Sequence, residues 1–210
     1  MNSSILIVVF VQLWWVWLFT LRFGECRECV CIPSERETLI KLKHDLIDPS
    51  NRLWSWNNAT SNSNCCHWPG VLCDNLTSHV LQLHLNTSID AFYDELDNEF
   101  DAEAYERFQF GGEISSCLAD LKHLNYLNLS GNKLGEGMAI PSFLGTMTSL
   151  THLDLSFAGF WGNIPPHIGN LSNLVYLDLR DVANRTVPSQ IRNLSKLRYL
   201  DLSDNENLGE

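Results

Sequence analysis

The sequence predicts an α/β solenoid, a single elongated domain in which a short parallel strand recurs once in every turn. Two observations predict it: a leucine pattern that recurs four times within residues 121–210, and an apolar-proline pair that recurs between its copies. A third feature, a cysteine-rich segment ahead of the repeats, indicates a cap that closes the first turn. A chain of 210 residues can build a continuous core by stacking such turns.

Residues 1–26 have the pattern of a secretory signal peptide. The apolar run from Ile5 to Leu21 is interrupted by only two polar residues, although no Lys or Arg precedes it. Cleavage after Cys26 would leave six of the seven cysteines. The remaining chain is therefore expected to be extracellular, where cysteines pair as disulfides.

Residues 29–80 are predicted to form the cap, and they begin with a helix. The segment 34–37 matches a capping box, which places the helix start there, and Pro49 ends it. The apolar residues at helical spacing share one face, which we expect to be buried. These residues are Leu39, Leu42 and Leu46.

The second half of the cap combines aromatic residues with cysteines. Trp54, Trp56 and Trp68 are expected to form its core, because aromatic burial seals the end of a solenoid. The cluster Cys65-Cys66-His67 is interpreted as disulfide partners rather than a zinc site, because the compartment is oxidising.

The decisive feature is internal repetition, which defines the four turns of residues 121–210. Equivalent leucines stand at Leu127, Leu153, Leu177 and Leu200, at intervals of 26, 24 and 23 residues. This is a leucine-rich-repeat period. Each leucine points into a shared core, while the Leu-x-Leu segment forms a strand that pairs with the next turn.

An apolar residue followed by proline recurs on the opposite side of each turn. Proline lacks an N–H group, so it suits a segment outside the strand ladder, and the preceding apolar residue is expected to reach inward. The pairs are Ile140-Pro141, Ile164-Pro165 and Val187-Pro188, with Ile114-Ser115 as a degenerate copy.

Residues 81–120 are predicted to form a first repeat that carries an acidic insertion at 87–110. From Asp90 to Phe110 there are eight acidic residues and one Arg, which supply −7 of the net charge of −11. The acidic balance excludes a nucleic-acid partner. The insertion is either a contact loop with aromatic anchors or a solvated insertion of the kind loops tolerate, and we favour the second. It lacks the glycine and the final acid of an EF-hand.

The repeats resemble the plant-specific leucine-rich repeats, whose consensus is L-x-x-L-x-x-L-x-L-S-x-N-x-L-x-G-x-I-P. The segment from Cys31 to Cys73, with its C-I-P-S-E-R start and C-C-x-W-x-G-V-x-C end, resembles the plant N-terminal cap. The resemblance implies disulfides Cys31–Cys65 and Cys66–Cys73, and it leaves the pairing of Cys29 and Cys117 open. Ala158 and Val182 replace the consensus asparagine that Asn132 and Asn205 retain, so the amide ladder should be interrupted there.

The chain is most similar in kind to plant cell-surface receptor-like proteins, including the ethylene-inducing xylanase receptors. Such proteins carry an ectodomain of many repeats, one membrane helix and a short tail without a kinase. The resemblance implies recognition of a protein, peptide or glycan ligand, with signalling through a co-receptor kinase in defence or development. It places the full-length protein in the plasma membrane facing the apoplast. The chain stops inside a repeat, so we expect a fragment of a longer receptor.

Two alternative functions remain for such a sequence: a secreted inhibitor of a microbial cell-wall hydrolase, similar to the polygalacturonase inhibitors, and the ectodomain of a receptor kinase. The sequence contains no nucleophile elbow, zinc-protease motif, phosphate loop or kinase signature. We therefore predict no catalysis, no cofactor and no metal.

The candidate ligand-binding residues flank the strand leucines, because alternation along a strand directs them to one concave face. One column is Tyr/His/Tyr/Tyr and the next is Asn/Asp/Asp/Asp. An equally simple interpretation is that these are the usual strand residues of the family. The residues are Tyr126, Asn128, Ser130, His152, Asp154, Ser156, Tyr176, Asp178, Arg180, Tyr199, Asp201 and Ser203.

Seven Asn-X-Ser/Thr sequons follow the signal, so glycosylation is expected at several of them. A glycan on the fourth, at Asn128, would block the concave face. The sequons are Asn58, Asn75, Asn86, Asn128, Asn170, Asn184 and Asn193.

Overall fold

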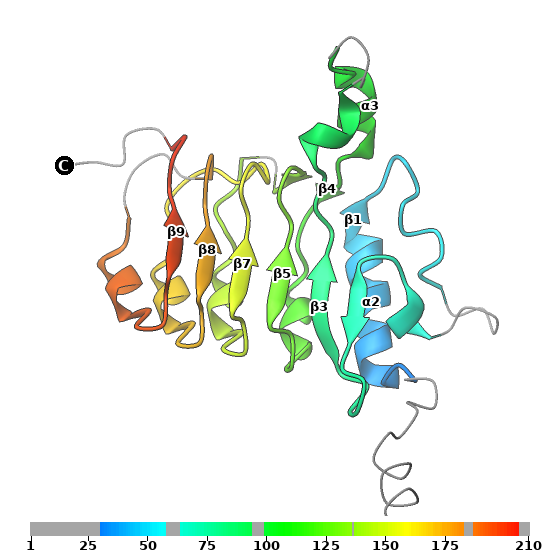
Figure 1. The fold of residues 1–210 in the computed structure, drawn as a ribbon, viewed down its shortest axis with the longest axis horizontal. Coiled ribbons are helices and arrows are strands. Elements are labelled where there is room, and N and C mark those ends of the chain that lie inside the picture. The colour runs from blue at the N-terminus through cyan, green and yellow to red at the C-terminus, as the bar shows by residue number, and fades with distance from the viewer. Residues whose placement is uncertain (1–29, 58–63, 94–98, 136, 183–186, 206–210) are drawn as a thin grey trace, which may run out of the picture.

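The computed structural model describes residues 30–57, 64–93, 99–135, 137–182 and 187–205. They form a short solenoid whose strands stand side by side, with the cap at one end (Figure 1). The predicted signal, residues 1–26, and Cys29 lie outside the described residues, as do Asn58 and Asn184.

One sheet of six strands forms the concave face, in the order β2-β3-β5-β7-β8-β9. The first pair is antiparallel and belongs to the cap, and every later pair is parallel, as stacked turns require. The strands are β2 (Val71–Cys73), β3 (Val80–His84), β5 (Tyr126–Asn128), β7 (His152–Asp154), β8 (Tyr176–Asp178) and β9 (Tyr199–Asp201).

The opposite side of each turn is a short 3-10 helix rather than a strand. At Gly145 a Cβ atom would collide with the carbonyl oxygen of His167 in the next turn, so the close stacking of these helices requires glycine there. The four helices are Ser116–Asp120, Ser142–Thr146, Pro166–Asn170 and Ser189–Asn193. A smaller three-stranded sheet joins β1 (Leu46–Ile47), β4 (Gly111–Gly112) and β6 (Lys133–Leu134).

The strand leucines form the core that the repeat period predicts. Leu127, Leu153 and Leu177 are each 0% exposed, whereas Leu200 on the last described strand is 41% exposed. The contrast shows the physical rule of the fold. A turn cannot bury its own leucine, which needs the following turn to cover it.

The apolar residues of the proline pairs reach inward in three of four turns. Ile114, Ile140 and Ile164 are buried, as predicted. Val187 is 38% exposed and belongs to the same outer turn as Leu200, so it lacks the same cover.

The cap helix α2 (Pro33–Asp45) differs from the predicted one at both ends. It begins at Pro33 with Ile32 as N-cap and without a side-chain cap hydrogen bond, so the expected capping box does not form. Proline suits this first helical position because its missing N–H group has no helical partner to lose. The helix ends at Asp45, ahead of Pro49, and its apolar face is buried as expected.

Glu35 connects the cap helix to the first strand of the repeats. Its carboxylate accepts a hydrogen bond from the Val80 N–H group at 2.8 Å and lies 2.8 Å from Nδ1 of His79. The side chain is buried. This acid therefore positions β3 instead of capping its own helix.

Two of the three tryptophans form the cap core, and the third does not. Trp56 and Trp68 are buried and stacked, with ring centroids 5.5 Å apart. The indole N–H group of Trp56 donates to the carbonyl of Pro69 at 3.1 Å, which satisfies its one donor. Trp54 is 66% exposed, so its prediction as a core residue was wrong: neighbouring positions in this turn face opposite ways.

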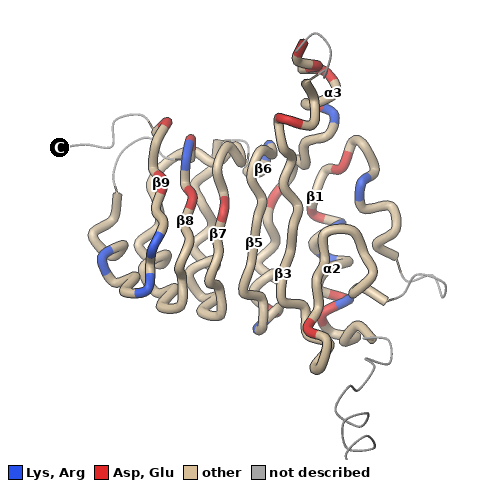
Figure 2. Tube along the Cα trace, viewed as in Figure 1, with Lys and Arg blue, Asp and Glu red and all other residues tan. Residues whose placement is uncertain are grey.

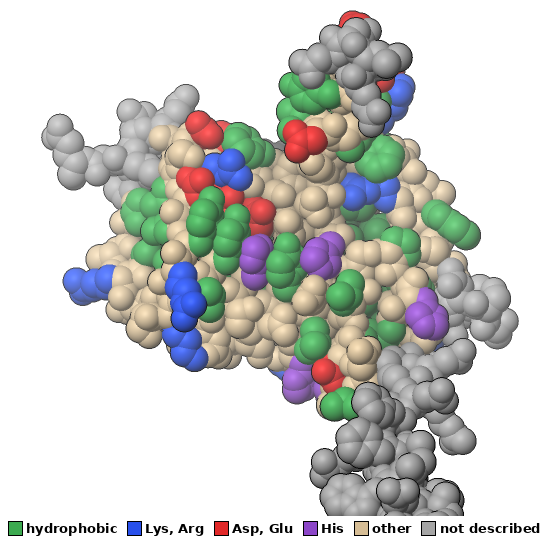
Figure 3. Space-filling model, viewed as in Figure 1, with side chains coloured by type: hydrophobic (Ala, Val, Ile, Leu, Met, Phe, Trp, Pro, Cys, Tyr) green, Lys and Arg blue, Asp and Glu red, His purple; other side chains and the backbone are tan. Residues whose placement is uncertain are grey.

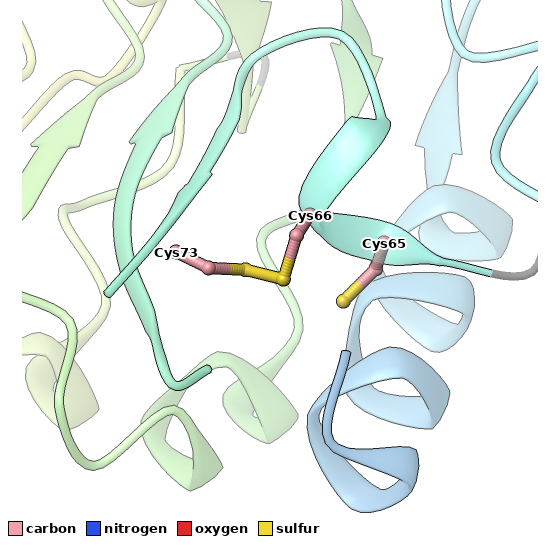
Figure 4. A group of neighbouring side chains, drawn as sticks. All are labelled: Cys65, Cys66 and Cys73. Carbon is pink, nitrogen blue, oxygen red and sulfur yellow. A yellow bond between two sulfur atoms is a disulfide. The ribbon is translucent and has the colours of Figure 1, made fainter. Parts of the chain in front are cut away.

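The two disulfides implied by the family resemblance are present. Cys31 is bonded to Cys65, and Cys66 to Cys73. Figure 4 shows the sulfur of Cys65 beside the Cys66–Cys73 bond, and the two disulfides account for the gathering of these three cysteines. Among the described residues Cys117 is the free cysteine, and it is half-buried.

In two of the repeats, the asparagine that follows the strand binds backbone groups of its own repeat and of the preceding one. The Asn132 amide donates to the carbonyls of Leu85 and Leu129, both at 2.8 Å, and its oxygen accepts from the Phe110 N–H group and from Thr87. Asn205 makes the equivalent bonds to Leu179, Leu202 and Val182. Buried Ala158 and Val182 stand between them, so the ladder is interrupted as predicted.

The acidic insertion is a folded lobe that stands above the concave sheet (Figure 1). It contains a 3-10 helix, Ile89–Phe92, and helix α3 (Ala102–Phe108), and five aromatic rings pack against one another between them. Its ends, Thr87 and Phe110, are buried in the solenoid. The described parts of the insertion are thus folded, whereas its acidic composition favoured a solvated loop.

Arg52 from the cap holds the base of this lobe. Its guanidinium donates to the carbonyls of Asn86 at 2.8 Å and Phe108 at 3.0 Å, and to the hydroxyl of Thr87 at 2.8 Å. It also lies 4.2 Å from the centroid of the Phe110 ring. Burial lowers the pKa of this guanidinium, while the charge of Asp48 opposes the shift.

We expect Arg52→Met to release the lobe from the cap. Three hydrogen bonds from a charged donor are lost while the aliphatic volume remains, so the free energy of unfolding should fall by about 2–4 kcal/mol. Limited proteolysis should then cut within residues 87–110. Arg107→Met is the matched control, because Arg107 makes an exposed i,i+4 pair with Glu103 that contributes only about 0.5 kcal/mol. Equal effects of the two changes would contradict the anchoring role.

We expect Asn132→Ala to cost about 3–4 kcal/mol of unfolding free energy, because buried backbone groups of two turns lose their partner. Tryptophan fluorescence in a denaturant titration measures this. Asn173→Ala is the control: Asn173 is surface-facing and donates to Thr148 at 3.0 Å, and its loss should cost under about 1 kcal/mol. A small effect at Asn132 would show that the ladder is dispensable.

Candidate ligand-binding face

The parallel register aligns the predicted site residues in three columns across the concave face. Tyr126 pairs with His152, His152 with Tyr176, and Tyr176 with Tyr199, which forms the first column. The second column is Asn128, Asp154, Asp178 and Asp201. The third follows two residues after it, at Ser130, Ser156, Arg180 and Ser203. Neighbouring members are one strand spacing apart, about 4.8 Å.

The first column forms a continuous ladder of stacked rings. The centroids of Tyr126 and His152 are 4.0 Å apart, those of His152 and Tyr176 are 4.0 Å apart, and those of Tyr176 and Tyr199 are 4.3 Å apart. The planes of the last pair differ by only 2°. The rings appear in Figure 3 as a row of purple and green side chains that crosses the strands.

His84 extends the ladder by a fifth ring that the sequence did not predict. In the sheet register His84 pairs with Asn128, which would place it in the second column. Its ring instead stacks on Tyr126, with centroids 4.3 Å apart, and its Nε2 lies 3.0 Å from the side-chain oxygen of Gln82. His84 was not predicted because the acidic insertion interrupts its repeat and hides the leucine period. The signal that could have indicated it was the aromatic ring of His84 itself.

Burial lowers the pKa of both ladder histidines. For His152 the positive charge of His84 adds to this effect, while Asp178 opposes it. Each ring is therefore less protonated than a solvated histidine at the same pH. A neutral ring stacks on tyrosine without the cost of a desolvated charge.

The second column has a structural role that recurs in every turn. One oxygen of Asp154 accepts from the Ser156 N–H group at 3.0 Å and from its hydroxyl at 2.7 Å. Asn128 binds Ser130 in the same way, and Asp201 binds Ser203. These bonds stabilise the turn that leaves each strand, which accounts for the Asp/Asn-Leu-Ser pattern.

The second carboxylate oxygens distinguish the three aspartates. Asp178 is 0% exposed, and Arg180 donates to its Oδ2 from Nη2 at 2.8 Å and from Nε at 3.1 Å. Arg180 also lies 3.6 Å from Asp201, whose Oδ2 accepts from the hydroxyl of Tyr199 at 3.1 Å. Figure 2 shows the acidic residues of β7, β8 and β9 side by side.

Asp154 lacks these partners. Its Oδ2 makes no hydrogen bond or ion pair with any residue that the structure describes, although the residue is only 9% exposed. Burial raises the pKa of this carboxyl, and the charge of Asp178 adds to the shift, while the two Ser156 bonds and the charge of Arg180 oppose it. Asp154 is thus disfavoured in its charged form, in contrast to Asp201, whose pKa is lowered.

The predicted sequons differ in accessibility. The side chain of Asn128 is half-buried and its oxygen binds Ser130. Asn86 is half-buried, whereas Asn75, Asn170 and Asn193 are exposed. Asn170 and Asn193 end two of the 3-10 helices, on the side opposite the concave sheet.

Comparison with known proteins matches this architecture. The family described as Leucine rich repeat N-terminal domain matches residues 32–74, and leucine-rich-repeat families match residues 123–147, 149–171 and 193–209. Receptor-like protein EIX1 of Solanum lycopersicum is 36% identical over 71% of this chain, and Receptor-like protein EIX2 of the same plant is 32% identical over 74% of it. The chain belongs to the plant receptor-like proteins with leucine-rich repeats. It spans 14% of the length of each of these two relatives.

Solved plant ectodomains share the fold of this receptor-like chain. The structure of PEPR1-AtPEP1 superposes with a TM-score of 0.64 at 28% identity, over 81% of this chain and 21% of that one. The BIR2 ectodomain of Arabidopsis thaliana gives a TM-score of 0.62 at 27% identity, over 83% of both chains. Within the described ranges, no helix is long and apolar enough to cross a membrane.

The electrostatics of the second column predict opposite effects of two matched substitutions. The folded-state pKa of Asp154 is raised, so its ionisation destabilises the fold above the ordinary Asp pKa of 3.8. Asp154→Asn should therefore increase the melting temperature at pH 7, and the gain should vanish as the pH falls below that value. Asparagine retains the oxygen that caps Ser156, as Asn128 does in the preceding turn.

Asp201→Asn is the comparison. Its pKa is lowered by hydrogen bonds from Ser203, so its charge stabilises the fold above pH 3.8, and this contribution disappears as the pH falls through the lower folded-state pKa. This substitution should reduce the melting temperature at pH 7. Thermal unfolding followed from pH 3 to pH 8 measures both. A loss of stability in Asp154→Asn at pH 7 would refute the assignment.

Proposed function

We propose that this chain is part of the extracellular, ligand-recognising region of a plant cell-surface receptor-like protein, and that its ligand binds across the concave ring ladder. The ladder of His84, Tyr126, His152, Tyr176 and Tyr199 carries this proposal. Its five rings form one continuous surface, whereas large apolar side chains on a soluble protein are usually scattered.

The stacking prepares these rings for binding. Each stacked contact contributes about 0.5–1.5 kcal/mol, so the rings are held before a ligand arrives and lose little conformational entropy on binding. Because neighbours cover the ring faces, a ligand meets ring edges and tyrosine hydroxyls. Such edges combine apolar area with hydrogen-bonding groups, which is the character of protein and peptide interfaces.

The relatives favour a receptor over a secreted inhibitor. EIX1 and EIX2 are receptor-like proteins, and the GASSHO1/SCHENGEN3 ectodomain, which superposes with a TM-score of 0.61 at 30% identity over 79% of this chain and 18% of that one, was crystallised in complex with CASPARIAN STRIP INTEGRITY FACTOR 2. By analogy, the ligand of this protein is a peptide or protein, and the ectodomain recognises rather than catalyses.

The remaining parts of this proposal concern the whole receptor. A secretory signal at residues 1–26 directs the chain outside the cell, a C-terminal membrane helix anchors the full-length protein in the plasma membrane, and a co-receptor kinase transmits the signal. The receptor signals in defence against microbes or in developmental perception. Asparagine-linked glycans at the exposed sequons would leave the concave face accessible.

Selection of a displayed random-peptide library on the secreted chain tests the binding face. We expect the selected peptides to lose at least about tenfold in affinity for the double variant Tyr126→Ser, Tyr176→Ser, because two central rings are removed. The control double variant His167→Ser, Gln190→Ser changes exposed residues of the 3-10 helices on the opposite side. Peptides that bind the ladder variant as well as the wild type would place recognition elsewhere.

A further inference from the structure

We infer that Asp154 is a subsite for a basic side chain of the ligand, an arginine guanidinium or a lysine ammonium, at the centre of the concave face. This inference rests on the proposed function and specifies the chemistry of the same site. It follows from a comparison of three turns of the one chain, in which the same residue has different surroundings.

The three aspartates occupy one register position but do not have the same partners. In two turns a tyrosine hydroxyl reaches the second oxygen: Tyr176 lies 3.4 Å from Asp178, and Tyr199 lies 3.1 Å from Asp201. In the turn of Asp154 the corresponding ring is His152, whose shorter side chain carries no hydroxyl. The Oδ2 atom of Asp154 is left without a partner among the described residues.

The third column gives Asp154 no cation of its own. Arg180 stands two residues after Asp178 and neutralises it, with Asp201 at 3.6 Å from the same guanidinium. The equivalent residue after Asp154 is Ser156, which is neutral and already bound to Oδ1. Arg180 is thus the departure from serine in this column, and Asp154 is the one of the three aspartates that it does not contact, although its charge acts on Asp154 from farther away.

A buried carboxylate without a cation costs free energy unless a partner supplies the charge. Asp178 shows what partner the position accepts, because the guanidinium of Arg180 fills it with two hydrogen bonds to Oδ2. A basic side chain of the ligand would give Asp154 the bond that Arg180 gives Asp178. Charge-assisted bonds of this kind are about twice as strong as neutral ones.

The surroundings favour a single organic cation over a metal ion. Asp154 offers one free oxygen, its neighbour Asp178 is covered by Arg180, and Asn128 on the other side is neutral. A divalent cation needs several oxygen ligands. The rings on each side of His152 stack at 4.0 Å and would flank the aliphatic stem of a bound lysine or arginine.

Binding of two capped peptides to the full secreted chain tests the inference. The probes are acetylated, amidated tri-arginine and tri-citrulline, which have nearly the same shape and differ in charge. We expect the wild type to bind tri-arginine at least about tenfold more tightly than tri-citrulline. Calorimetric or fluorescence titration at low salt measures both affinities.

Three variants separate a specific subsite from a general acidic field. Asp154→Asn keeps the cap of Ser156 but removes the charge, and His152→Tyr keeps the charge but brings a hydroxyl to Oδ2, as Tyr176 and Tyr199 do in their turns. Each should weaken tri-arginine binding about tenfold or more. Asp120→Asn removes the same charge from an exposed carboxylate at the end of a 3-10 helix on the side opposite the concave sheet, so it should change the affinity less than about threefold.

Loss of binding in all three variants to the same degree would show a diffuse electrostatic attraction and overturn the inference. So would unchanged binding in His152→Tyr, or a wild type that does not distinguish the two probes. The proposed function fails separately. If the library yields peptides that require Tyr126 and Tyr176 but contain no basic residue, the concave face recognises ligands and Asp154 is not the subsite.

Discussion

The burial of one leucine by the next turn is the constraint on which the rest of the structure depends. Leu127, Leu153 and Leu177 are completely buried because a following strand covers each of them, and Leu200 shows the exposure that results without such cover. This dependence makes the fold an array, since stability comes from interfaces between turns. It also fixes the parallel register, because strands of equal position must stack to bring their leucines together.

The functional surface is a consequence of that register. Side chains on either side of each leucine point away from the core, so the stacking that aligns the leucines also aligns their neighbours at one strand spacing. Tyrosine and histidine at one such position become a ladder of rings, and aspartate at the next becomes a row of charges. The fold thus places equivalent side chains of successive turns side by side. This enlarges a contact surface, but it also sets like charges next to one another, and their repulsion is destabilising. Arg180 relieves that repulsion by direct contact at Asp178 and Asp201, whereas it acts on Asp154 only from a greater distance.

The sequence predicted the parts that repetition determines and missed the parts that single contacts determine. The four strand leucines, the inward isoleucines and the interrupted asparagine ladder all follow from positions in a period. The exposure of Trp54 and the helix start at Pro33 do not, because each depends on which neighbour packs there. The capping box failed for the same reason: the helix begins at Pro33 with Ile32 as the N-cap residue, so Ser34 is already inside the helix. His84 was missed because the insertion separates its strand from the rest of the pattern.

Departures from the repeat carry more information about recognition than the repeat itself. The Asp-Leu-Ser pattern is explained by the bonds that cap each turn, so the presence of an aspartate at this position says little about a ligand. What differs between turns is the second oxygen, and the difference arises from His152 in place of tyrosine and from the position of Arg180, which contacts Asp178 and Asp201. A histidine retains the ring that the ladder needs while it withdraws the hydroxyl that the carboxylate needs. The ring of His152 therefore continues the ladder through β7, while the buried carboxylate of Asp154 on the same strand is left for a ligand to neutralise.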